Sequence, residues 1–211
     1  MSTDRGAYIN PFLWAVARCI LGPAFWLLFR LRTVGADNIP EHGPTLFVAN
    51  HMSMWDPPMI GQALASRRRI YFMAKSELFD IPVLGWAIRR LGAFPVARGN
   101  ADRAAIRTAR DVLGRGDALL MFPEGTRHTD GQFGEAWPGA GSLALADGVV
   151  VVPVVIEGTN RRIGPVRVAV GKPLDLSDLP DLSRGERSQI AADRMMAAIG
   201  ALRAPKYNER A

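Results

Sequence analysis

Short apolar runs alternate with longer segments of mixed polarity between residues 45 and 170. The runs are rich in β-branched and aromatic residues and end at glycine, proline or polar turns, which is typical of buried strands. The valine-rich run at 149–156 is the clearest of them. The predicted strands cover residues 46–49, 70–74, 94–97, 118–122, 149–156 and 166–170.

The segments between these runs are predicted to be helices. They cover residues 57–65, 82–91, 101–113, 140–146 and 184–202, and Asn100 is a candidate cap for the third of them. Ser183 and Glu186 form the pattern of a capping box at the start of the last helix. Alternation of strands with helices predicts an α/β fold with a mixed, largely parallel sheet flanked by helices. Residues 33–44, rich in glycine and proline, are predicted to be a connection with little strand.

The segment at residues 11–31 is apolar and contains two tryptophans and three phenylalanines. It is about long enough to cross a bilayer, which takes ~20 apolar residues. Arg18 interrupts it, however, and Gly22-Pro23 is expected to break it into two short helices. We therefore expect a helical hairpin that lies in the membrane interface, with the aromatic side chains in lipid and Arg18, Arg30 and Arg32 at headgroups. A pair of helices packed on the protein core is the alternative.

Three units follow from this division: a membrane-interface hairpin at 1–33, an α/β domain at 34–204 and a flexible tail at 205–211.

With 48% hydrophobic residues the 211-residue chain is too apolar to be disordered. The net charge of +6 suits nucleic acid, a phosphate-bearing substrate or an anionic membrane. The single Cys19 excludes an internal disulfide and a four-cysteine zinc site, which fits a reducing cytosol. No cleavable signal peptide is expected, because the first ten residues are polar.

His51 and Asp56 lie in the loop between the first buried strand and the next helix. In such a loop Asp56 can fold back onto the imidazole and orient His51 as a general base. The simpler interpretation is that Asp56 only caps the helix that begins at Pro57, and that His51 is an ordinary loop histidine.

Further polar groups follow two later strands. Arg98 precedes Gly99-Asn100 at a predicted helix start, where a guanidinium, free backbone N–H groups and the helix dipole could together hold a phosphate. Arg98 could equally be a surface arginine. The other group, from Glu124 to Arg127, follows the strand at 118–122.

Within this second group Gly125 would let a ligand approach the backbone closely, and Thr126 and Arg127 could bind phosphate. Glu124 could accept a hydrogen bond from a substrate hydroxyl or hold Arg127.

Pro153 interrupts the valine-rich strand. Because proline cannot donate to a sheet ladder, Pro153 predicts either an edge or bulge, where Pro153 and Val154 could line a channel for an acyl chain, or a buried strand that tolerates one proline.

Taken in order, these blocks resemble the PlsC-like 1-acylglycerol-3-phosphate acyltransferases, a group of lysophospholipid acyltransferases. The resemblance runs from about residue 45 to residue 170, and the apolar N-terminal segment also suits the group. The matching segments are Asn50-His51-x4-Asp56, Phe94-Pro95-Val96-Ala97-Arg98-Gly99, Phe122-Pro123-Glu124-Gly125-Thr126-Arg127, Val152-Pro153-Val154 and the lysine-containing stretch from Met73 through Lys75 to Phe79.

Two positions depart from the pattern of the group. Members often have Phe-Lys-x-Gly after the third block, where this chain reads Ala136-Trp137-Pro138-Gly139 and has no lysine. Ala97 stands directly before Arg98, where an acidic residue is frequent.

The resemblance implies transfer of a fatty acyl group from acyl-CoA or acyl carrier protein to the free hydroxyl of lysophosphatidic acid, giving phosphatidic acid. His51 would be the base and Asp56 its partner, and no metal or further cofactor is expected. The remaining residues implied to contact substrate are Asn50, Lys75, Arg98, Glu124, Gly125, Thr126 and Arg127. The expected partners are membrane lipids at the cytoplasmic face, bound through the hairpin in a peripheral or monotopic manner, and not nucleic acid.

Other functions remain open from the residues. The acceptor could be another lysophospholipid, glycerol 3-phosphate or a different lipid alcohol. Ser53 could be the nucleophile of a hydrolase with His51 and Asp56, although no Gly-x-Ser-x-Gly elbow occurs. A metal hydrolase using His51, Asp56, Glu124 and His128 is possible by residue type. A basic lipid-binding module without catalytic activity would explain the charge and the apolar segment but would not need a His-Asp pair.

Overall fold

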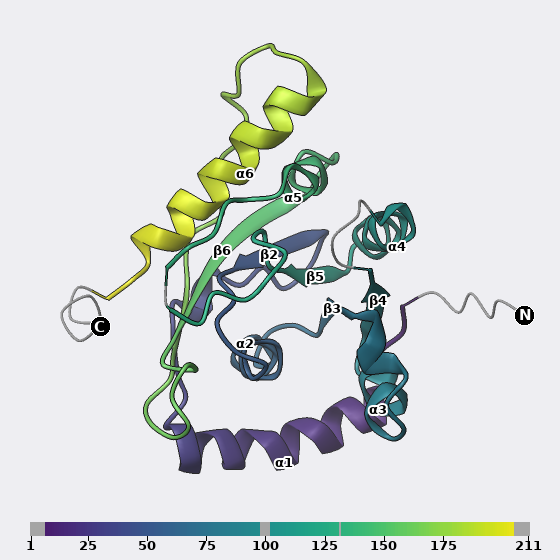
Figure 1. Ribbon diagram of the computed structural model, residues 1–211, viewed down its shortest axis with the longest axis vertical. Coiled ribbons are helices and arrows are strands. Elements are labelled where there is room, and N and C mark those ends of the chain that lie inside the picture. The colour runs from purple at the N-terminus through teal and green to yellow at the C-terminus, as the bar shows by residue number, and fades with distance from the viewer. Residues whose placement is uncertain (1–6, 98–101, 131, 205–211) are drawn as a thin grey trace, which may run out of the picture.

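The computed structural model describes residues 7–97, 102–130 and 132–204. Within them, the strands form one sheet in the order β1-β7-β6-β2-β5-β3-β4 (Figure 1). Neighbouring strands are parallel except for the β6–β7 pair, so the predicted mixed, mostly parallel sheet is confirmed. The strands are β1 (Arg32–Val34), β2 (Thr45–Ala49), β3 (Ile70–Lys75), β4 (Ala93–Val96), β5 (Ala118–Met121), β6 (Val150–Glu157) and β7 (Arg167–Val170).

Helices cover both faces of the sheet, as Figure 1 shows, with α4, α5 and α6 on one side and α1 and α2 on the other. The alternation of side chains along each strand divides the core accordingly: Leu46 and Val48 pack with the first group, and Phe47 and Ala49 with the second. The helices are α1 (Pro11–Phe29), α2 (Asp56–Leu64), α3 (Leu84–Arg90), α4 (Arg103–Gly114), α5 (Pro138–Ala144) and α6 (Arg184–Ala201), with short 3₁₀ turns η1 (Ala36–Asn38) and η2 (Ser76–Phe79).

The sequence prediction missed one strand. β1 lies in the region predicted to be mainly connection, and its three residues are all exposed. Arg32 donates its backbone N–H to the carbonyl of Val166, and the strand then pairs with β7. Because β1 is defined by this distant partner rather than by a run of buried residues, its own sequence carries little signal. The capping box of Ser183 and Glu186, in contrast, is present at the start of α6.

The expected N-terminal hairpin is wrong, because α1 runs unbroken through Gly22 and Pro23. A proline inside a helix removes one backbone hydrogen bond and crowds the preceding turn. Here the ring is on the exposed side, and the buried Phe25 and Phe29 pack against the domain beyond it. Both phenylalanines contact Trp55, at ring centroid distances of 6.2 and 6.4 Å. This packing on the far side of the proline holds the helix together.

The outward face of α1 is also apolar. Phe12, Ile20, Trp26 and Leu27 are exposed along it, Phe12 to 74%. Of the residues the structure describes, α1 is the one helix long and apolar enough to cross a membrane by length and composition. The helix is therefore apolar on its inward face, which packs on the domain, and on its outward face, which is exposed.

Pro153 lies in a central strand, not at an edge. β6 is hydrogen-bonded to β2 on one side and β7 on the other, and Pro153 is buried opposite Val48. Its carbonyl accepts from the N–H of Gly171, one residue beyond the end of β7. Since the nitrogen and carbonyl of one strand residue face the same neighbour, the missing N–H of Pro153 faces a place where the β7 ladder has already ended.

Candidate active site

The loop that joins β2 to α2 carries the histidine, and Asn50 anchors this loop to the sheet. Its side-chain amide donates to the carbonyl of Ile156 at 3.0 Å, and its amide oxygen accepts from the N–H of the same residue at 2.8 Å. The side chain thus continues the β2–β6 ladder beyond Ala49. Asn50 is buried and both polar atoms of its amide bond to the backbone of Ile156, so it supports the loop that carries His51.

Asp56 folds back onto His51. Its Oδ2 atom lies 2.8 Å from Nδ1 of His51 and accepts the backbone N–H groups of Met52 and Ser53 at 2.6 and 2.7 Å. Its Oδ1 atom accepts the hydroxyl of Thr159 at 2.6 Å. Asp56 is 0% exposed, so this set of donors replaces water around the carboxylate.

The helix-cap interpretation of Asp56 does not describe this geometry. Asp56 is the first residue of α2, the cap position belongs to Trp55, and no side chain caps the helix. The carboxylate points backward into the loop, where it holds both the imidazole and the backbone next to it.

The His51 ring is fixed on its other sides as well. It stacks on the ring of Phe122, with centroids 4.0 Å apart and planes 15° from parallel. Since Nδ1 faces Asp56, Nε2 is the ring nitrogen that can meet a substrate, and His51 lines two cavities.

The turn after β5 is bound to the histidine loop. Glu124 accepts the backbone N–H of His51 at 3.1 Å and that of Gly134 at 2.7 Å, and the N–H of His128 bonds to the carbonyl of His51 at 2.8 Å. The imidazole of His128 also lies 3.6 Å from Glu124. Burial raises the pKa of the Glu124 carboxyl, while the hydrogen bonds from Gly134 and His51 act in the opposite direction. Both carboxylate oxygens of Glu124 therefore serve to join two loops.

Three residues of this turn face outward. Gly125 has a φ of +65°, a conformation that glycine adopts without strain, and Thr126 and Arg127 are exposed.

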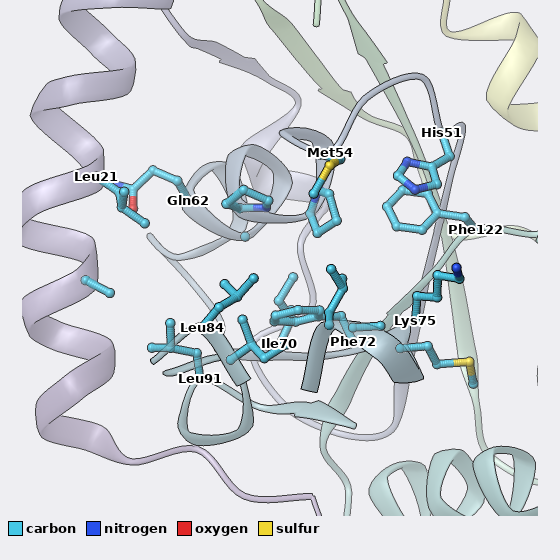
Figure 2. Close-up of a pocket in the computed structure, with 18 of the residues that line it drawn as sticks. Leu21, His51, Met54, Gln62, Ile70, Phe72, Lys75, Leu84, Leu91 and Phe122 are labelled. Atoms are coloured by element: carbon cyan, nitrogen blue, oxygen red, sulfur yellow. The ribbon is translucent and has the colours of Figure 1, made fainter. Parts of the chain in front are cut away.

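The first cavity, which we call the α1 cavity, has a volume of about 520 Å³ and lies between α1, α2, β3 and α3. Figure 2 shows His51, Phe122 and Lys75 together at one end of it, and Leu21, Leu84 and Leu91 at the other. One end contains the histidine and a lysine, and the remainder is walled mainly by apolar side chains, with Arg18 and Gln62 among them.

Two cations line the α1 cavity beside His51: Lys75 and Arg127. Lys75 forms an ion pair of 2.8 Å with Glu77, and this contact lowers the pKa of Glu77 to about 2. Arg98 and Asn100, predicted from sequence as phosphate contact and helix cap, lie outside the described residues. Asp102 caps α4, accepting from the N–H groups of Ala104 and Ala105.

The second cavity, the α4 cavity, also has a volume of about 520 Å³ and lies on the other side of Phe122, toward α4. Ala105, Ile106 and Trp137 form part of its wall, together with Glu124, Gly125 and Thr126 of the turn after β5. His51, Met73 and Phe122 line both cavities. His51 therefore lies at the boundary between the two cavities.

Pro153 and Val154 lie in the buried centre of the sheet and line neither cavity. Sequence reasoning missed Thr159 and Phe122. Thr159 follows the carboxyl end of β6, next to β2, which is where polar site residues gather in such sheets. The described part of the chain holds no cluster of at least three His, Cys, Asp or Glu side chains suited to a metal ion.

Comparison with known proteins defines the class of this fold and site. Residues 30–157 match the family model described as Acyltransferase, which covers more than half of the chain. The chain belongs to this family, within the PlsC-like 1-acyl-sn-glycerol-3-phosphate acyltransferases.

Three similar proteins illustrate this family membership. The chain is 36% identical over 154 residues to the 1-acyl-sn-glycerol-3-phosphate acyltransferase of Streptococcus pneumoniae, covering 70% of this chain and 56% of that protein. It is 32% identical over 200 residues to the lyso-ornithine lipid O-acyltransferase of Pseudomonas aeruginosa, covering 81% and 76%. The crystal structure of PlsC from Thermotoga maritima superposes with a TM-score of 0.69 at 28% identity, covering 90% of this chain and 80% of that one. The chain spans little more than half the length of several curated relatives.

Proposed function

We propose that the protein transfers a fatty acyl group from a thioester, acyl-CoA or acyl carrier protein, to the free hydroxyl of lysophosphatidic acid, forming phosphatidic acid. The observation that carries this proposal is the buried His51–Asp56 pair, whose histidine lines two cavities. Two of the relatives named above act, by name, on 1-acyl-sn-glycerol 3-phosphate or its equivalent, which supports the choice of acceptor.

In this mechanism Nε2 of His51 accepts the proton of the acceptor hydroxyl while its oxygen attacks the thioester carbonyl carbon. The tetrahedral intermediate then expels the thiolate, which receives the proton from His51 and leaves as a thiol. General-base assistance of this kind contributes ~100- to 10,000-fold. Asp56 stabilises the imidazolium that forms and keeps Nδ1 protonated. No enzyme nucleophile is needed, so Ser53 has no covalent role.

The α1 cavity offers places for parts of both substrates. The α1 cavity, mostly apolar and within the usual size range of ligand sites, would hold an acyl chain with its reacting end near His51. Lys75 and Arg127 at the same end would attract the phosphate of the acceptor, assisted by Thr126 and Arg98. A phosphate held there would bring the hydroxyl to His51 and reduce the entropy cost of the encounter.

We further propose that the protein sits on the cytoplasmic face of the membrane as a peripheral or monotopic enzyme. Phe25 and Phe29 fix one face of α1 against the domain, so the helix lies along it and its exposed apolar face meets the lipid. Both lipid substrates are expected to be drawn from that surface.

Replacing His51 by alanine tests the reaction. Purified protein and the variant are assayed with acyl-CoA and acyl carrier protein donors against lysophosphatidic acid, with folding checked by circular dichroism. We expect transfer to lysophosphatidic acid to fall by about two to four orders of magnitude in His51→Ala. Activity retained within tenfold in a folded variant would refute the role of the base.

Lyso-ornithine lipid is a second acceptor to include in the same assay. The name of the Pseudomonas aeruginosa relative specifies this lipid, and the chain covers 76% of that protein. If the wild-type protein acylates lyso-ornithine lipid faster than lysophosphatidic acid, the acceptor assignment is wrong although the reaction class stands.

A further inference from the structure

The turn at residues 81–86, which follows η2 and includes the first three residues of α3, presents an unusual number of apolar side chains to the outside. Ile81 is 46% exposed, Val83 78%, Leu84 38% and Trp86 51%. Pro82 is exposed as well. Four large apolar side chains within six residues form a patch, and such patches mark binding surfaces more often than single exposed residues do.

The backbone of this turn is strained at its tip. Val83 has φ +63° and ψ −53°, and the N–H of Leu84 bonds to the carbonyl of Pro82 at 2.6 Å, which is the geometry of a γ-turn. A β-branched residue rarely adopts this conformation. Gly85 fastens the turn to the body, since a Cβ there would lie 2.3 Å from the carbonyl oxygen of Phe79. The turn is therefore a fixed projection that holds Val83 outward.

The 81–86 turn lies on the same side of the molecule as α1. The N–H of Asn10, at the start of α1, bonds to the carbonyl of Arg90 at the end of α3 at 2.7 Å. Figure 1 shows α3 beside the first turns of α1. Both elements also wall the α1 cavity, α1 through Leu21 and the turn through Ile81 and Leu84. The turn and α1 therefore flank the same cavity, and each also presents exposed apolar side chains to the outside.

Basic side chains accompany the patch. The guanidinium of Arg90 lies 4.4 Å from the ring of Trp86, and that of Arg89 lies 4.5 Å from the ring of Phe79. Asp80 is the acidic residue next to the turn, while Glu77 is paired with Lys75. Tryptophan next to arginine is the combination that suits the boundary between acyl chains and anionic headgroups.

We propose that the 81–86 turn is a second membrane anchor, which inserts Val83 and Trp86 into an anionic bilayer beside α1. The inference rests on the membrane attachment proposed above and adds a second, separate point of contact. With α1 and the turn both in the lipid, the α1 cavity between them faces the bilayer. A lipid chain could then enter the cavity sideways without passing through water.

The test measures binding of the full-length protein to vesicles by co-flotation, with vesicles of phosphatidylcholine alone and of equal parts phosphatidylcholine and phosphatidylglycerol. The double variant Val83→Ser/Trp86→Ala removes the two proposed insertions, neither of which lines the α1 cavity or the α4 cavity. The matched control is Leu182→Ser, which removes a 44% exposed apolar side chain just before α6, on the far side of the sheet. Light scattering reports the oligomeric state of every variant.

We expect the double variant to bind phosphatidylglycerol vesicles about tenfold more weakly than the wild type, and the control to bind equally. The wild type should also prefer the anionic vesicles. Unchanged vesicle binding of a folded double variant would overturn the proposal. So would a loss of self-association without a loss of vesicle binding, because the patch would then bind a second copy of the chain.

A parallel assay separates this inference from the proposed reaction. In detergent micelles, where no bilayer must be bound, the double variant should keep its turnover within about threefold, whereas His51→Ala should lose turnover and still bind vesicles. If His51→Ala stays active, the proposed reaction fails, but the anchor is still judged by vesicle binding alone.

Discussion

Replacing Asp56 by asparagine separates the charge of the carboxylate from its hydrogen bonds. The amide oxygen can take the place of Oδ2 and accept the same three N–H groups, from His51, Met52 and Ser53. The amide nitrogen would then face the hydroxyl of Thr159, which can turn to accept instead of donating. We therefore expect Asp56→Asn to fold, with a loss of about 1–2 kcal/mol in the free energy of unfolding.

The effect on the rate should be much larger. When His51 becomes an imidazolium, its charge lies about 4 Å from that of the carboxylate, and at an effective dielectric constant near 20 their attraction is about 4 kcal/mol. Part of this is offset because the buried carboxylate already has other partners. The expected loss in kcat is about 100- to 1,000-fold, with KM for both substrates little changed.

Steady-state kinetics in detergent micelles and urea unfolding of the same preparations measure both quantities. Asp56→Ala is the comparison, since it leaves the N–H of Met52 and the hydroxyl of Thr159 buried without partners and should lose several kcal/mol of stability, at about 1–3 kcal/mol for each group. An Asp56→Asn protein that folds and keeps kcat within tenfold would refute electrostatic stabilisation of His51.

Two further substitutions test the surroundings of the pair. Thr159→Val leaves Oδ1 of Asp56 without its donor, so kcat should fall about tenfold at unchanged KM. The hydroxyl returns in Thr159→Ser, and kcat should recover. Equal kcat in the two variants would show that Thr159 is not a positioning residue. Glu124→Gln tests how the stability of the protein depends on pH. Because burial raises the folded pKa of Glu124 above its ordinary value of 4.5, the unfolded chain binds fewer protons between the two values, and wild-type stability should decrease as pH rises from 4.5. Glutamine is neutral at every pH and, like the protonated carboxyl, has one carbonyl acceptor, so the variant should be close to the wild type in stability at low pH and gain relative to it as pH rises. Urea unfolding at stepped pH measures the difference in stability, and a difference that does not change with pH would contradict a raised pKa.

The parts of the site that could be predicted from sequence are those encoded locally. His51 and Asp56 are five positions apart in one loop between a buried strand and a helix, so their contact follows from the chain itself. The strands of the core were predictable for the same reason, since each is a short, mainly apolar run. The capping box of α6 was also predictable, because Ser183 and Glu186 lie close together in the sequence.

The parts that could not be predicted depend on distant partners. Thr159 reaches Asp56 across 103 positions, and no local pattern marks it. The continuity of α1 through Pro23 depends on Phe25 and Phe29 packing against Trp55. Pro153 is tolerated in a central strand because β7 ends opposite it, which only the sheet order reveals. In each case tertiary contacts override the local preference.

The mutual bonding of the two loops at the site has a consequence for turnover. His51 gives its N–H to Glu124 and receives at its carbonyl the N–H of His128, so the base and the turn that carries Thr126 and Arg127 form one body before any lipid arrives. The entropy of arranging them is lost once, when the chain folds, and not in every catalytic cycle. Because the two loops are already joined, closure of the protein around an acceptor headgroup would add little further ordering. For the proposed lipid substrates, the slow steps are then expected where acyl chains enter and leave the α1 cavity rather than in the chemistry.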